Sequence, residues 1–216
     1  MTFKLYGFWR SIASCRVRVA LRLKGIEFEE ISIDILSGRQ FDPSYDAINP
    51  AHALPALVHN GNLLVQSLPI IEYLDQLYPD PPLLPADARD RAYVRALALV
   101  TVADTHPLTV PRVRNYLAHA FGAGQDAVHG WAEHWISEGF KTYERLLTQR
   151  PPAPFAAGAS PGLADICIAG HIASADLFKF NTSAFPIVAA LGARCFAIPA
   201  FASSHPFAQP GAPKQV

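Results

Sequence analysis

The fold is decided near the start of the chain, where residues 3–33 read FKLYGFWRSIASCRVRVALRLKGIEFEEISI. Phe3 and Leu5 alternate with polar or small residues, which predicts a strand. Residues 13–24 have the apolar spacing of a helix, and Gly25 is suited to end it because glycine adopts the left-handed conformation easily. Apolar residues at positions 28–33 indicate a second strand. This stretch therefore predicts a strand–helix–strand unit.

The predicted helix presents different side chains on different faces. Val17 and Leu21 lie four residues apart on one face, and Arg18 and Arg22 lie four apart on another. After the second strand, residues 36–49 have no clear periodicity, and we expect an irregular loop with a short helix there.

A β-hairpin is predicted at residues 55–65. Asn60-Gly61 stands between two apolar runs and supplies the positive φ angles of a tight primed turn. Ser67 is expected to cap the next helix, whose first turn tolerates Pro69. The proline-rich segment 79–85 cannot continue that helix, which indicates a linker.

Strand patterns are absent from the sequence after this linker. Helical periodicity recurs over residues 92–103, 131–147 and 164–177, with breaks that contain Pro or Gly. We therefore predict two domains, an α/β domain at residues 1–79 and an all-α domain at residues 86–216, joined by a linker at residues 80–85.

Composition argues against several classes of protein. The chain of 216 residues has 18 basic and 18 acidic side chains, so it lacks the positive field of a nucleic-acid-binding protein. Its first residues do not follow the pattern of a signal peptide, and the late apolar stretch 185–201 is too broken by charge and proline to cross a membrane. Three cysteines without metal-ligand spacing predict free thiols in the cytoplasm and no metal site.

Residues 11–21, SIASCRVRVAL, resemble the signature of zeta-class glutathione transferases, a family that includes maleylacetoacetate and maleylpyruvate isomerases. The resemblance implies a thioredoxin-like α/β N-terminal domain, an all-α C-terminal domain, glutathione as the cofactor and a homodimer. Further similarities follow in register along the chain: Asn49-Pro50, Leu54-Pro55-Ala56-Leu57, Gln66-Ser67, Leu83-Leu84-Pro85, Ala164-Asp165-Ile166-Cys167, Phe178-Lys179, His205-Pro206 and Gln209-Pro210.

The resemblance implies that Ser11 stabilises the glutathione thiolate. A free thiol has a pKa of about 8.5, so glutathione needs help to ionise at neutral pH. A hydroxyl at the start of a helix can donate a hydrogen bond to the sulfur, and the helix N-terminus adds positive potential. The residues alone leave open whether Ser11 does this or only caps the helix. The resemblance favours catalysis, with Ser14 as the nearby alternative and Cys15 as a third candidate that is better explained as a packed, inert thiol.

Residues that bind glutathione are implied by the same resemblance. Leu54-Pro55 resembles the cis-proline element that offers the backbone of Leu54 to the cysteinyl part of glutathione. Gln66 and Ser67 suit the γ-glutamyl carboxylate at a helix N-terminus. The resemblance adds His52, Asp104 and His106 on the glutathione side, and Arg10 and Arg112 for carboxylates of the second substrate. A purely structural or surface role is the alternative for the two histidines and the two arginines.

Four positions depart from the family pattern. Ile12 and Ala13 stand where the family has a second serine and a cysteine, and Leu177 stands where it has an arginine implicated in holding a carboxylated substrate. Gly162 replaces the Ser or Thr of a capping box, although Asp165 can still reach back to the start of its helix.

We therefore expect a zeta-like glutathione S-transferase that activates glutathione for attack on a small, electron-poor, often carboxylated substrate. The same thiolate supports conjugation, displacement of a halide and cis–trans isomerisation of maleylacetoacetate or maleylpyruvate, and Leu177 favours a broader transferase over a dedicated maleylacetoacetate isomerase. The alternatives are a non-catalytic glutathione-fold binding protein and a monothiol disulfide reductase that uses Cys15.

Overall fold

The structure is a computed structural model that describes residues 2–214. Its contacts divide the chain into two compact units. The first runs up to Leu83 and also includes the segment from Pro199 onward, whereas the second spans Leu84–Ile198. The domain boundaries that the sequence suggests, residues 1–79 and 86–216 around a linker, stay a prediction, and the last segment is the part whose contacts lie with the first unit.

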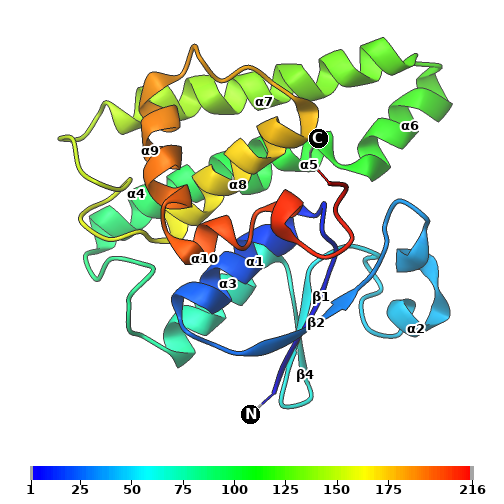
Figure 1. Cartoon of the computed structure of the whole chain (residues 1–216), viewed down its shortest axis with the longest axis horizontal. Helices are drawn as coiled ribbons and strands as arrows, with labels where there is room; N and C mark the ends of the chain where they lie inside the picture. Colours follow the sequence, from blue (N-terminus) through cyan, green and yellow to red (C-terminus); the bar gives the residue numbers. More distant parts are fainter. Residues whose placement is uncertain (1, 215–216) are drawn as a thin grey trace. The chain divides into compact units, whose positions relative to one another are not determined.

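The first unit is built on a four-stranded sheet with the strand order β2-β1-β3-β4. Its strands are β1 (Phe3–Gly7), β2 (Phe28–Ser32), β3 (Ala56–His59) and β4 (Asn62–Val65). β1 is parallel to β2 and antiparallel to β3, which is antiparallel to β4. Helices α1 (Ile12–Leu23) and α3 (Ser67–Leu77) pack against each other on one side of this sheet (Figure 1). The predicted strand–helix–strand unit is therefore confirmed.

Two turns form where the sequence predicts them, because both need positive φ angles. Gly25 has a φ of 64° just after α1, and its N–H donates to the carbonyl of Arg22. Asn60 and Gly61 have φ angles of 50° and 80° and join β3 to β4 in the expected hairpin. These turns bring β3 next to β1 and place the start of α3 beside α1.

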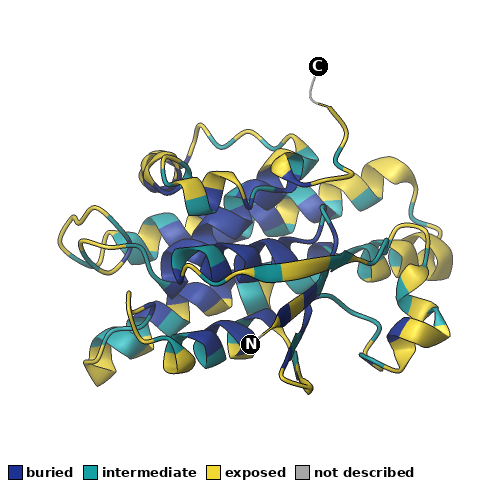
Figure 2. Ribbon diagram, turned by 60° about the horizontal axis from the view of Figure 1, so that its bottom comes forward, coloured by how far each residue is buried: buried dark blue, intermediate teal, exposed yellow. Residues whose placement is uncertain are grey.

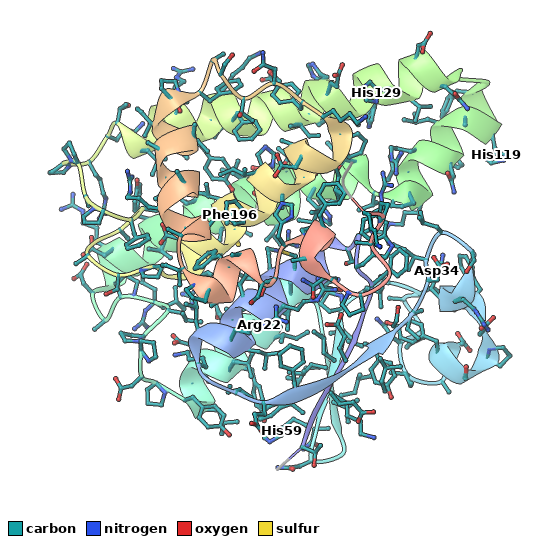
Figure 3. The ribbon with its side chains drawn as sticks, in the orientation of Figure 1. Arg22, Asp34, His59, His119, His129 and Phe196 are labelled. Carbon is teal, nitrogen blue, oxygen red and sulfur yellow. The ribbon has the colours of Figure 1, made fainter. Side chains whose placement is uncertain are left out.

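The two arginines that helical spacing places on one face of α1 have different environments. Arg18 is only 1% exposed, and its guanidinium bonds the carboxylate of Glu30 on β2 and the carbonyl oxygen of Phe8. Arg22, labelled in Figure 3, is partly exposed. It donates to the carbonyl of Ser203 and the hydroxyl of Ser204. Burial of Arg18 is tolerated because the Glu30 carboxylate pairs with the charge and accepts from Nε and Nη2, while the Phe8 carbonyl accepts from Nη2.

Four short elements complete the first unit. η1 (Arg39–Phe41) and α2 (Pro43–Asp46) form the irregular connection between β2 and β3, as predicted. α10 (Pro199–Ala202) packs on α1, and η3 (Pro206–Ala208) follows it. The contacts of α10 explain why the end of the described chain belongs to this unit.

The named elements of the second unit are all helices, and an isolated β-bridge joins Phe155 to Gly158 in the connection before α8. Its helix α8 packs against α4, α7 and α9 and is buried along most of its length, as its small and apolar residues on every side would predict. Figure 2 shows such buried segments next to helices that are buried on one face only. The elements are α4 (Ala88–Leu99), η2 (Val100–Thr105), α5 (His106–Thr109), α6 (Pro111–Phe121), α7 (Gln125–Leu147), α8 (Leu163–Phe178) and α9 (Pro186–Phe196).

Asp165 closes the N-terminus of α8. Its two carboxylate oxygens accept hydrogen bonds from the backbone N–H groups of Gly162 and Ala156, both at 2.9 Å. The contact to Gly162 is the reach back to the helix start that the sequence predicts. Burial raises the pKa of Asp165 to about 6, although the backbone donors act in the opposite direction.

Within residues 2–214, every helix is too short or too polar to cross a bilayer.

Candidate active site

Ser11 forms the N-terminal boundary of α1. Its backbone is extended, with φ −75° and ψ 110°, and its hydroxyl oxygen accepts hydrogen bonds from the backbone N–H of Ser14 at 3.1 Å and from the Ser14 hydroxyl at 3.0 Å. A hydroxyl has two lone pairs and one proton, so both lone pairs of Ser11 are engaged. The Ser11 hydroxyl therefore serves a ligand as a donor. Ser11 also caps the helix, so the two roles left open by the sequence are compatible.

The turn before Ser11 is held by buried Arg18. The carbonyl oxygen of Phe8 accepts from the Ser11 N–H at 3.0 Å and from Nη2 of Arg18 at 2.7 Å. The same guanidinium is anchored by Glu30, whose carboxylate lies so close to Gly7 that a Cβ there would clash with it. Arg18 and Gly7 thus hold in place the backbone turn that carries the Ser11 hydroxyl.

Ser14 and Cys15 lie behind Ser11. The side chain of Ser14 is fully buried and donates to Ser11, so it contacts the candidate donor directly. Cys15 is 3% exposed, and burial raises the pKa of its thiol in spite of the opposing charges of Arg18 and Arg16. A buried thiol with a raised pKa is a poor nucleophile.

The peptide bond between Leu54 and Pro55 is cis, as the family resemblance suggests. Two side chains hold the loop before it: Tyr45, which was not predicted to do so, and Asn49, which was named only as part of the Asn49-Pro50 similarity. Tyr45 donates its hydroxyl to the carbonyl of Ala53 at 2.6 Å, and the Asn49 amide donates to the same carbonyl at 2.8 Å. Burial raises the pKa of Tyr45 to about 12, so its hydroxyl remains a donor at neutral pH. Leu54 itself stays partly exposed at the start of β3.

Ser67 does not cap α3, which corrects one expectation from the sequence. Gln66 occupies the N-cap position with a φ of 71° and no side-chain cap, and Ser67 is the first helical residue. The Ser67 hydroxyl is engaged by another group: Nε and Nη2 of Arg16 donate to its oxygen at 3.1 and 3.0 Å. Gln66 is exposed, whereas Ser67 and Arg16 are buried.

Two further predicted residues lie on the first unit. His52 is half-buried, with Nε2 at 2.7 Å from the Asp46 carboxylate and its ring against Phe41. Arg10 directly precedes Ser11, and its guanidinium lies over the ring of Trp9 at 5.9 Å. Burial lowers the pKa of Arg10 from its ordinary value.

The other three predicted residues lie on the second unit. Asp104 is exposed within η2, a π-helical turn of a kind often found at functional sites. His106 begins α5 and is half-buried, and Arg112 is exposed in the first turn of α6. Their place in a common site with Ser11 stays a prediction.

Arg16 and Arg18 were not predicted to contribute to the site. Arg16 donates to the Ser67 hydroxyl, and Arg18 donates to the Phe8 carbonyl that also accepts from the Ser11 N–H. The available signal was a pair of charged residues inside a helix whose neighbours are mostly apolar. As for metals, residues 2–214 contain no group of three or more His, Cys, Asp or Glu side chains placed to hold an ion.

Comparison with known proteins gives consistent matches. Residues 1–76 match the family model of the glutathione S-transferase N-terminal domain. A maleylpyruvate isomerase of Ralstonia sp is 40% identical over 208 residues, which cover 96% of this chain and 98% of that protein.

Two solved structures are similar over nearly the whole chain. One is a holo maleylpyruvate isomerase, described as a bacterial zeta-class glutathione S-transferase, with a TM-score of 0.94, 39% identity and coverage of 97% of this chain and 100% of that one. The other is a maleylacetoacetate isomerase from Methylobacterium extorquens AM1 with bound malonate and glutathione, with a TM-score of 0.95, 40% identity and coverage of 98% and 100%.

Proposed function

Because this chain belongs to the zeta class of the glutathione S-transferase family, we propose that it is an enzyme that uses glutathione for cis–trans isomerisation of a small carboxylated substrate. The expected architecture, a thioredoxin-like N-terminal sheet with a helical remainder, is that of the family. When bound, glutathione supplies a thiolate that adds to an electron-poor double bond, allows rotation and then leaves.

The observation that carries this proposal is the hydroxyl of Ser11 at the start of α1. Both of its lone pairs accept from Ser14, so its proton is available to an anion such as a thiolate. The positive end of α1 acts in the same direction. In this proposal Ser11 donates to the sulfur, and Ser14 orients Ser11 from behind.

The remaining predicted residues receive binding roles. Leu54, next to the cis bond, offers its backbone to the cysteinyl part of glutathione, and Gln66 and Ser67 take the γ-glutamyl carboxylate at the start of α3. A carboxylate suits Ser67 because the hydroxyl oxygen already accepts from Arg16, which leaves the hydroxyl proton to donate to the ligand. The other proposed contacts are His52, Asp104 and His106 for glutathione and Arg10 and Arg112 for the second substrate.

The reaction is tested by supplying purified protein with glutathione and one of four electrophiles: maleylpyruvate, maleylacetoacetate, a dihaloacetate or an aryl halide. The proposal predicts isomerisation of at least one of the first two, with glutathione recovered unchanged. Binding of glutathione without turnover of any of the four would favour the non-catalytic alternative.

Leu177 is expected to limit activity toward doubly carboxylated substrates. It is half-buried in the last turn of α8, and a leucine cannot pair with a carboxylate. Leu177→Arg should raise kcat/KM for maleylacetoacetate by about tenfold, the value of one modest charge-assisted hydrogen bond. Leu177→Met, which keeps volume and adds no charge, is the control and should change kcat/KM little. An equal response to both substitutions would exclude charge recognition at this position.

Cys15 is expected to be dispensable for turnover. Its thiol is buried with a raised pKa, so Cys15→Ala should leave kcat/KM for isomerisation within about twofold of the starting value. The measurement is steady-state turnover, together with a glutathione-linked disulfide reduction assay on both proteins. Disulfide reduction that is present in the unmodified protein and absent from Cys15→Ala would support the monothiol reductase instead.

The protein is also proposed to be a cytoplasmic homodimer. Leu63 and Val65 are exposed on β4, an edge strand of the sheet, and a shallow groove on α3 is lined by Leu68, Pro69, Glu72, Tyr73 and Gln76. An exposed apolar edge of this kind suits a second copy of the chain. Light scattering of the purified protein should give twice the mass of the chain. A cytoplasmic location agrees with three buried cysteines that are not joined in disulfide bonds.

A further inference from the structure

Arg16 is a buried cation at the junction of α1 and α3. It is 2% exposed, and it directs two N–H groups at one hydroxyl oxygen, that of Ser67, which is 3% exposed. The two residues are 51 positions apart in sequence, and the helices that carry them pack against each other. This arrangement places a permanent positive charge directly behind the first residue of α3.

The geometry determines what the Ser67 hydroxyl can offer a ligand. A guanidinium is a donor only and keeps its proton in proteins, so it cannot exchange roles with the hydroxyl. Both bonds from Arg16 end on the Ser67 oxygen, which is therefore the acceptor toward Arg16, and the single hydroxyl proton is left to donate to another group. Donation by a cation also polarises the O–H bond, which strengthens its hydrogen bond to an anion.

We propose that Arg16 is a positioning residue that keeps the Ser67 hydroxyl as a hydrogen-bond donor and thereby makes the start of α3 selective for the γ-glutamyl carboxylate of glutathione. Arg16 acts through Ser67 and does not itself need to touch the ligand. The inference rests on the proposed function, because it assumes that glutathione binds at this helix end.

The surroundings of Ser67 agree with recognition of an anion. The first turn of α3 has no acidic residue and no side-chain cap, so its N–H groups and the positive end of the helix are not neutralised from within the helix. A neutral group would lose the benefit of both the helix and the polarised hydroxyl.

The test compares two ligands by isothermal titration calorimetry. One is glutathione, and the other is 4-aminobutyryl-Cys-Gly, which is glutathione without the γ-glutamyl carboxylate. Arg16→Gln replaces a permanent donor with an amide that can accept the Ser67 proton. It should weaken glutathione binding by about tenfold or more and leave binding of the decarboxylated peptide within about twofold. Ser67→Ala should give the same loss of preference, and Arg16→Gln should add little to it in the double variant.

Arg22→Gln is the matched control. Arg22 lies on the same helix, but its guanidinium bonds Ser203 and Ser204, so the same substitution should leave the preference between the two peptides unchanged. Arg16→Lys is the second variant, needed if Arg16→Gln does not fold. It keeps a charged donor and should retain a preference for glutathione within about threefold of the unmodified protein.

The inference is overturned if Arg16→Gln weakens the binding of both peptides equally, because a residue that only stabilises the fold would have this effect. It is also overturned if Arg16→Lys loses the preference for glutathione over the decarboxylated peptide as fully as Ser67→Ala does. If the unmodified protein binds neither peptide, both the proposed function and this inference are contradicted. If that protein binds glutathione and isomerises its substrate, but substitutions of Arg16 leave the preference for glutathione over the decarboxylated peptide unchanged, only the present inference is contradicted.

Discussion

Replacing Ser11 with alanine is expected to lower kcat/KM for isomerisation by about one to three powers of ten. The hydroxyl of Ser11 is the donor at the first turn of α1, and its removal leaves the thiolate with the helix end alone. The fold should survive, because loss of an N-cap serine costs about 1 kcal/mol of unfolding free energy. Steady-state kinetics and a urea unfolding curve on the same preparation measure the two effects.

Ser14→Ala is the control for this variant. It removes one of the two hydrogen bonds that the Ser11 oxygen accepts but leaves the Ser11 hydroxyl in place, so the loss in kcat/KM should be smaller than that of Ser11→Ala. A larger loss in Ser14→Ala than in Ser11→Ala would transfer the catalytic role to Ser14. An unchanged rate in both variants would leave only the backbone of α1 as the thiolate donor.

Replacing Asp165 with alanine is expected to lower the free energy of unfolding by about 2–4 kcal/mol. The substitution leaves the backbone N–H groups of Gly162 and Ala156 without their acceptor in a buried place, and each such loss costs about 1–3 kcal/mol. Because α4, α7 and α9 all pack on α8, the substitution should destabilise the whole second unit. Urea denaturation followed by circular dichroism measures it.

Asp165→Asn keeps one acceptor oxygen and is the matched control. Its amide nitrogen faces one of the two backbone donors, so we expect a destabilisation between zero and that of Asp165→Ala. A change below about 0.5 kcal/mol in Asp165→Ala, the range of an ordinary surface substitution, would show that the two N–H groups find other partners.

Features with a local physical cause could be predicted from the sequence. Gly25, Asn60 and Gly61 were predicted at turns because few residues adopt positive φ angles at low cost, and all three do so here. Asp165 was predicted to reach back to Gly162 because three residues separate a helix start from the group that caps it.

Helix boundaries in the second unit were less predictable. Periodicity indicated a helix over residues 92–103, but α4 begins at Ala88, where the side chain of Asp87 caps it, and gives way to the π-helical turn η2 at Val100. The hydrophobic pattern weakens in the polar first turn of a helix, and a π-helical turn has no simple sequence signature.

Contacts between distant parts of the chain could not be predicted from the sequence. Arg16 and Ser67 are linked across 51 residues, so their pairing depends on how α1 packs on α3. Ser67 was expected to cap α3 because serine often does so. Instead, the Ser67 hydroxyl accepts two hydrogen bonds from Arg16, and Gln66 occupies the N-cap position. Local propensity gave way to a tertiary contact.

The central claim is that the first turn of α1 keeps the sulfur of bound glutathione ionised near neutral pH. The direct measurement is an ultraviolet titration of the thiolate absorption of glutathione bound to the protein, compared with glutathione free in buffer. The account predicts a midpoint at least about one pH unit below the value of about 8.5 for a free thiol. A bound midpoint equal to that of the free peptide would contradict it.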